Sequence, residues 1–61
     1  MTNFGTVKEQ CQYKNKVYFI CEYNGIYSLI EHDMVYNITN PILRCSDCDY
    51  VSFKLREELK K

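Results

Sequence analysis

The chain has 61 residues, of which 46% are hydrophobic, eight are basic and eight are acidic. This length allows one small domain, which buries only about 60% of its unfolded surface and would gain from a metal ion or a partner subunit. The balanced charge argues against a general nucleic-acid binder, because such proteins usually carry a basic excess that neutralises phosphates. The hydrophobic fraction is too high for a disordered chain. We therefore expect a single domain over residues 1–61.

The sequence shows no targeting or membrane segment. Residues 1–10 lack an apolar stretch of signal-peptide length, and no other segment is apolar over the length of a membrane span. We therefore expect a cytoplasmic protein, whose four cysteines stay reduced and act as metal ligands or buried residues. The chain lacks alanine and is rich in Lys, Tyr, Asn and Ile, whose codons are A/T-rich. This bias suggests a low-G+C bacterium or one of its viruses as the source.

The first predicted element is a polar strand at residues 6–13, which ends at a turn over Lys14-Asn15. The strongest pattern follows at residues 16–32, where two β-rich runs flank Asn24-Gly25. This dipeptide is typical of a two-residue type I′ hairpin turn, because both of its positions need a positive φ. Such a turn predicts four cross-strand pairs on one face: Tyr23 with Ile26, Cys21 with Ser28, Phe19 with Ile30, and Val17 with His32.

Both faces of this hairpin carry large apolar side chains. Alternation places Phe19 and Ile30 on one face, which we expect to be the main core face. A protein-binding surface is predicted on the opposite face, at Tyr18, Ile20, Tyr27 and Leu29. Because this second face is also apolar, it needs a cover, which is the C-terminal segment, a second subunit or a binding partner.

The remaining elements are shorter. We expect a strand at residues 34–38 and a turn at Asn40-Pro41. The segment 50–60 fits a helix, since Val51, Leu55 and Leu59 share a helical face, but residues 51–55 also alternate like a strand. We favour the helix. The predicted fold is thus a small β-rich α+β domain, with a three- to four-stranded antiparallel meander and a C-terminal helix. A bound zinc ion could stabilise this fold further.

One motif carries chemistry, the pair Cys45-x-x-Cys48. Two residues between cysteines let a tight turn direct both sulfurs at one tetrahedral ion. The context over residues 42–53, Ile-Leu-Arg-Cys-Ser-Asp-Cys-Asp-Tyr-Val-Ser-Phe, resembles the C-x2-C knuckle of zinc-ribbon proteins, with Asp49 where that family usually has glycine. The resemblance covers this segment alone and implies a zinc ion held in part by Cys45 and Cys48.

The sequence leaves alternatives for the other ligands of such a zinc ion. With a two-residue turn at 14–15, Cys11 lies opposite Tyr18, three residues along the ladder from Cys21, or on the order of 10 Å away. A site of Cys45, Cys48, Cys11 and Cys21 therefore requires a loop that folds back. A second interpretation is a zinc ion shared by two subunits, each giving Cys45 and Cys48. A third is four structural cysteines and no metal, because free Cys is often buried.

Function is predicted by exclusion. The chain contains no recognisable catalytic triad, phosphate loop or spaced carboxylate pair, so we do not expect an enzyme. We expect a small regulatory module that binds a larger host protein, with a viral or mobile-element modulator as one case. The alternative is a zinc-ribbon-like nucleic-acid-binding or transcription-associated protein, which would use the knuckle together with five basic residues: Lys14, Lys16, Arg44, Lys54 and Arg56.

Overall fold

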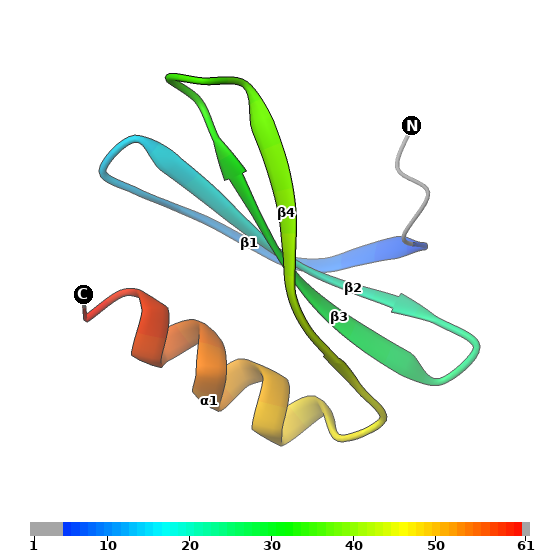
Figure 1. The fold of residues 1–61 in the computed structure, drawn as a ribbon. Coiled ribbons are helices and arrows are strands. Elements are labelled where there is room, and N and C mark those ends of the chain that lie inside the picture. Colours follow the sequence, from blue (N-terminus) through cyan, green and yellow to red (C-terminus); the bar gives the residue numbers. More distant parts are fainter. Residues whose placement is uncertain (1–4, 61) are drawn as a thin grey trace.

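The computed structural model describes residues 5–60, which form a four-stranded antiparallel sheet and one helix. The elements are β1 (Thr6–Tyr13), β2 (Lys16–Tyr23), β3 (Ile26–Asp33), β4 (Ile38–Cys45) and α1 (Cys48–Glu58). The strands follow one another in the sheet in chain order, and α1 packs along one side of the twisted sheet (Figure 1). The predicted α+β meander with a C-terminal helix is therefore confirmed, with four strands.

The β2–β3 hairpin has the predicted turn and register. Asn24 and Gly25 have φ values of 52° and 79°, the left-handed backbone that a type I′ turn requires. The Glu22 carboxylate accepts a hydrogen bond from the Gly25 N–H at 3.0 Å, which fastens the turn to its strand. The four predicted pairs are all present: Tyr23–Ile26, Cys21–Ser28, Phe19–Ile30 and Val17–His32. The predicted strand at β1 and its turn at Lys14-Asn15 are also confirmed.

The main core lies on the face of this hairpin that we expected to be the binding surface. Tyr18, Ile20 and Leu29 are 4%, 1% and 0% exposed and pack with Val51 and Leu55 of α1. Tyr27 is half-buried at the edge of this cluster. Of the three predicted covers, the C-terminal segment is the one in place, and Tyr18, Ile20 and Leu29 form no open surface for a partner.

The prediction that the face with Phe19 and Ile30 forms the main core is therefore wrong. Phe19 is only half-buried there, although Ile30 and Cys21 are buried, and no helix packs on that face within residues 5–60. Both faces of the hairpin satisfy the alternation rule. The position of α1 decides between them, and hairpin residues alone do not determine that position.

The segment after β3 differs from the prediction. Residues 34–37 form a turn, and the fourth strand begins only at Ile38 and includes Asn40 and Pro41, where we expected a turn. The Asp33 carboxylate accepts hydrogen bonds from the N–H groups of Val35 at 2.9 Å and Tyr36 at 3.1 Å, a local bond pattern that competes with strand formation. Pro41 fits a strand here because β4 is at the edge of the sheet.

Both edge strands are irregular. The register of β1 on β2 shifts between Val7 and Glu9, and that of β4 on β3 shifts between Leu29 and Ile30. A bulge of this kind bends a strand and increases its twist, which makes the edge a poor template for a further strand. The sheet therefore offers its faces and its turns, more than its edges, to other molecules.

The predicted helix is confirmed and begins two residues earlier than expected, at Cys48. Asp47 is its N-cap, and its carboxylate accepts a hydrogen bond from the Tyr50 N–H at 3.2 Å. Val51 and Leu55 are the buried residues of α1, while Tyr50 and Phe53 point away from the sheet and are exposed. Within residues 5–60 no helix has the length and apolar character needed to cross a membrane.

The packing of α1 predicts an unequal response to two neighbouring truncations. We expect Leu55→Ala to lower the free energy of unfolding by about 2–5 kcal/mol, because it opens a cavity in the one described core cluster. We expect Phe53→Ala to change it by less than about 0.5 kcal/mol, because that side chain is exposed. Urea unfolding followed by circular dichroism measures both. Equal losses would contradict the assignment of the α1 face to the core.

Candidate functional site

The four cysteines occupy different environments. Cys11 pairs with Tyr18 in the sheet, as the predicted register requires, and is half-buried against the core cluster. Cys45 ends β4 and also packs against this cluster, whereas Cys48 is the exposed first residue of α1. Cys21 is buried and, by alternation along β2, faces the other side of the sheet.

These positions do not bring the four cysteines together. Within residues 5–60 there is no group of three or more His, Cys, Asp or Glu side chains that could hold a metal ion. Cys45 and Cys48 flank the turn between β4 and α1, where the Cys45 thiol donates a hydrogen bond to the Asp47 carbonyl at 3.4 Å. This pair supplies two of the four ligands that a structural zinc site needs. Zinc binding stays a prediction. A site shared between two subunits is the version that requires no rearrangement of the sheet.

Burial also separates the cysteines by reactivity. Burial raises the pKa of the Cys21 thiol. Burial, and to a smaller extent the nearby Glu9 carboxylate, raises the pKa of the Cys11 thiol. A raised pKa lowers the fraction of reactive thiolate at a given pH, and burial also limits the access of a reagent.

We therefore expect iodoacetamide to modify Cys48 first and Cys21 last in the reduced, folded protein. A timed reaction at pH 8, analysed by peptide mass spectrometry, gives the order. The same reaction in urea is the control, because unfolding should remove the difference between the two residues. Modification of Cys21 as fast as Cys48 in the folded protein would show that β2 does not shield it.

The shared zinc site makes a separate prediction for native mass spectrometry with added zinc. We expect half a zinc ion per chain, carried by a dimer, because each chain gives only Cys45 and Cys48. Cys48→Ser should abolish this species, whereas Cys21→Ala should retain it. One zinc per monomer that is lost in Cys21→Ala would instead demand the four-cysteine site and a rearranged β2.

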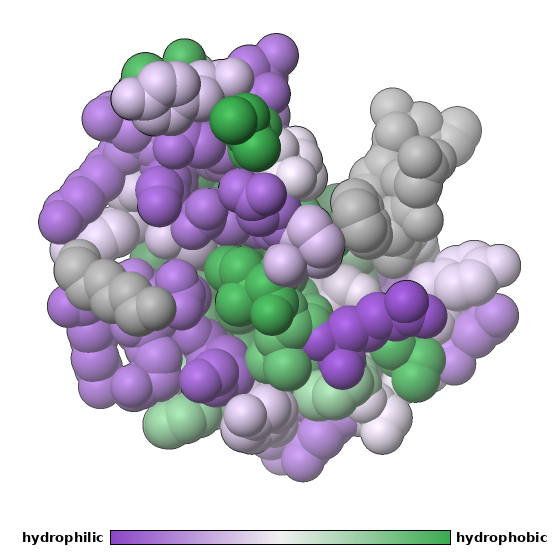
Figure 2. All heavy atoms as spheres, in the orientation of Figure 1, coloured by the Kyte–Doolittle hydropathy of each residue, from purple (hydrophilic) through white to green (hydrophobic). Residues whose placement is uncertain are grey.

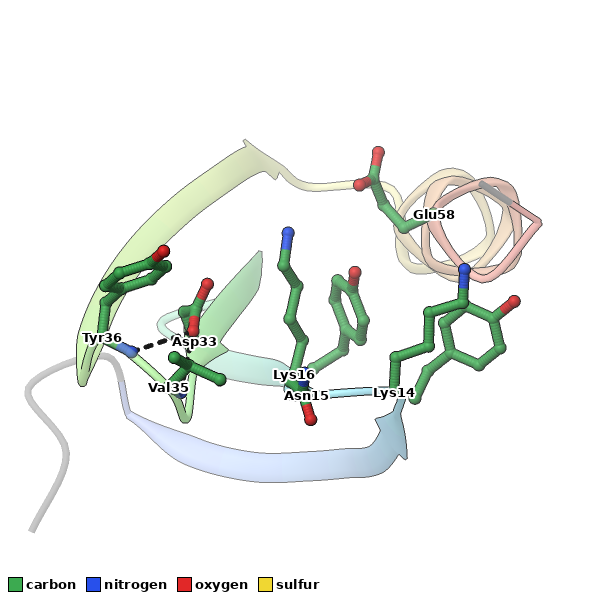
Figure 3. Close-up of a pocket in the computed structure, with 9 residues that line it drawn as sticks. Lys14, Asn15, Lys16, Asp33, Val35, Tyr36 and Glu58 are labelled. Atoms are coloured by element: carbon green, nitrogen blue, oxygen red, sulfur yellow. Dashed lines mark hydrogen bonds between the residues drawn. The ribbon is translucent and has the colours of Figure 1, made fainter.

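A second feature of the structure is a cleft at the opposite end of α1. It has a volume of about 490 Å³ and is formed by the β1–β2 turn, the start of β2, the β3–β4 turn and the last residue of α1, Glu58 (Figure 3). The residues that line it are Tyr13, Lys14, Asn15, Lys16, Tyr18, Asp33, Val35, Tyr36 and Glu58.

The cleft results from a difference in length. The 11 residues of α1 extend about 16 Å, whereas each strand of 8 residues extends about 26 Å. The helix therefore covers only part of the core face, and the end beside the two turns is left open. A hydrogen bond of 2.9 Å from the Met34 N–H to the Asn15 carbonyl ties these turns together and fixes the cleft wall.

Charged groups lie on both sides of the cleft. The Lys16 ammonium lies 3.3 Å from a Glu31 carboxylate oxygen, and the Lys14 ammonium lies 5.2 Å from the centre of the Tyr13 ring. Figure 3 shows both lysines rising from the strand below, with Lys14 under α1 and Glu58 extending from α1 above them. Burial, and then the Glu31 carboxylate, raises the pKa of the Tyr18 hydroxyl, so this group stays protonated well into the alkaline range.

The backbone at Lys14 is unusual. Its φ is 59°, in the left-handed region, where two asparagines, Asn24 and Asn37, are also found. Asparagine is enriched in that region, and lysine is not. The turn thus holds Lys14 at the cleft in a conformation that its side chain does not favour.

The β3–β4 turn also presents apolar side chains to solvent. Met34, Val35, Tyr36 and Ile38 are 42%, 62%, 74% and 51% exposed, and we call these four residues the apolar tip. Figure 2 shows hydrophobic side chains over this turn, apart from the larger group in the middle of the view. Val35 and Tyr36 belong to both the apolar tip and the cleft.

Sequence reasoning missed both the apolar tip and the cleft. The strand predicted at residues 34–38 overlooks Asp33 and Asn37, which are turn residues on either side of the Met-Val-Tyr run. The cleft combines residues from three separate parts of the chain, and no local pattern indicates such a combination.

The five basic residues predicted to contact nucleic acid lie in different parts of the structure. Lys14 and Lys16 line the cleft, whereas Arg44 pairs with Ser28 on the other face of the sheet. Lys54 and Arg56 belong to α1. The five basic residues thus do not form one patch.

Comparisons with known proteins give no relative from which a function could be transferred. No protein-family model, no curated protein and no solved structure matches the chain.

Proposed function

We propose that the protein is a protein-interaction module that binds a larger protein through the apolar tip. The observation that carries this proposal is the exposure of four large apolar side chains at the β3–β4 turn and the first residue of β4: Met34, Val35, Tyr36 and Ile38. Contiguous exposed apolar groups are uncommon on monomeric proteins and mark interaction sites. Tyrosine and methionine are among the residues enriched in interfaces.

The order of this turn supports the proposal. The Asp33 carboxylate accepts two backbone hydrogen bonds within it, and the Met34 N–H is bonded to the β1–β2 turn. Asn37, with a φ of 56°, returns the chain to β4 in a backbone conformation that asparagine tolerates. Side chains on a fixed turn lose less conformational entropy on binding than side chains on a disordered loop. The apolar tip is therefore pre-organised for contact.

The surface proposed here replaces the one expected from sequence. Tyr18, Ile20 and Leu29 are buried under α1, so a partner would have to displace the helix to contact them. The apolar tip needs no such rearrangement. As expected from the sequence, we propose that this contact regulates a larger host protein. The neutral net charge and the dispersed basic residues favour this role over nucleic-acid binding.

We expect Tyr36→Asp to abolish capture of the partner, because a carboxylate on the apolar tip would be desolvated in the interface. The protein is immobilised and exposed to an extract of its source cells, and the captured proteins are identified by mass spectrometry.

Tyr23→Asp is the matched control. Tyr23 is 65% exposed at the β2–β3 turn, and it lies outside the apolar tip. Proteins captured by the original chain and by Tyr23→Asp, but lost with Tyr36→Asp, are the expected partners. If Tyr36→Asp retains them while its circular dichroism is unchanged, binding does not use the apolar tip.

A further inference from the structure

We infer that Cys45 and Cys48 form a dithiol site that exchanges with the disulfides of low-molecular-weight thiols. The two residues flank the β4–α1 turn, which lies at one end of the molecule and away from the β3–β4 turn (Figure 1). Dithiol exchange at this place does not involve the apolar tip, so it goes beyond the proposed function and does not depend on it.

A hydrogen bond shows that the two cysteines are close. The Cys45 sulfur lies 3.4 Å from the Asp47 carbonyl oxygen, and the carbon of that carbonyl is bonded to the Cys48 nitrogen. Standard C=O and C–N bond lengths then place the Cys45 sulfur within about 6 Å of the Cys48 backbone nitrogen. The Cys48 side chain leaves the Cα atom next to that nitrogen. Its sulfur can therefore reach the Cys45 sulfur by rotation about the side-chain bond.

The two sulfurs differ in access. Cys48 is exposed, as are all of residues 46–50, so a small molecule can approach its sulfur. Cys45 is half-buried and packs against the core cluster, which limits its direct reaction with an external disulfide. An accessible cysteine beside a less accessible one suits exchange, because the first sulfur attacks the external disulfide and the second resolves the mixed disulfide.

The pair is open to this reaction in a single chain. Among residues 5–60, Cys45 and Cys48 belong to no group of three or more ligating side chains, so one chain does not enclose them in a four-ligand metal site. A zinc ion shared with a second chain would occupy both sulfurs. Exchange is therefore a reaction of the metal-free dithiol.

The exchange takes place in two steps. The Cys48 sulfur loses its proton to water and attacks one sulfur of the external disulfide, whose S–S bond breaks to release one small thiol. The Cys45 sulfur then loses its proton and attacks the Cys48 sulfur, which breaks the mixed disulfide and releases the second small thiol. The two cysteines lose two electrons and two protons, and the external disulfide gains both.

The test uses the reduced full chain and bis(2-hydroxyethyl) disulfide, with a chelator to remove zinc. This probe is uncharged, so the carboxylates of Asp47 and Asp49 on either side of Cys48 do not repel it. We expect peptide mass spectrometry to find a disulfide between Cys45 and Cys48, with the other two cysteines still free. Excess 2-mercaptoethanol should restore the dithiol by the reverse reaction.

Three variants assign the roles. Cys45→Ser should stop the reaction at a mixed disulfide on Cys48. Cys48→Ser should form a mixed disulfide on Cys45 at least about tenfold more slowly, because Cys45 is half-buried. Cys11→Ser is the matched control, since Cys11 is also half-buried against the core cluster, and it should leave the Cys45–Cys48 disulfide unchanged. Circular dichroism shows whether each variant is folded, and the result for the unaltered chain does not depend on them.

Four results would overturn the inference. No reaction with the probe would leave the site without exchange. A mixed disulfide that persists on Cys48 in the unaltered chain would make Cys48 an isolated exposed thiol. A disulfide that is lost in Cys11→Ser would place the reactive pair on the core side of the sheet. Equal rates of mixed-disulfide formation in Cys45→Ser and Cys48→Ser would remove the distinction between an attacking and a resolving sulfur.

Discussion

The packing of α1 against the sheet is the contact on which the rest of this structure depends. Val51 and Leu55 close the core over Ile20 and Leu29, and residues 5–60 contain no other helix that could do so. A domain of this size buries little surface, so the loss of this single contact removes a large share of its stability. The helix is also shorter than the strands it covers. The same element therefore completes the core at one end and leaves the cleft at the other.

The N-cap of α1 connects this packing to the cysteine pair. Asp47 accepts a hydrogen bond from Tyr50, which starts the helix immediately after the turn that holds Cys45 and Cys48. One end of α1 thus lies beside the two thiols that can share a metal, and the other end lies at the charged cleft. The two candidate sites are separated by the length of the helix. A dimer clasped at the thiols would consequently leave the cleft end of each chain accessible.

The sequence allowed the topology and the central hairpin to be predicted because those features depend on local chemistry. Asn24-Gly25 selects a two-residue turn, and such a turn fixes every pair of the strands that flank it. The position of Cys11 opposite Tyr18 followed from the same reasoning. The core face could not be predicted in this way, because Phe19 and Ile30 are as apolar as Ile20 and Leu29. The contact with a helix distant in sequence decides which face is the core. The sequence does not indicate the apolar tip, because two hydrogen bonds that the Asp33 carboxylate accepts from backbone N–H groups outweigh the strand preference of the residues that follow it.

The left-handed backbone at Lys14 has a consequence for the stability of the domain. For a residue with a Cβ atom this conformation costs roughly 1–2 kcal/mol, which glycine would avoid. In a domain of 61 residues that penalty is a sizeable part of the total stability. A protein optimised for stability alone would carry glycine at this turn. Lys14 therefore lowers the thermal resistance of this domain relative to a glycine at the same position.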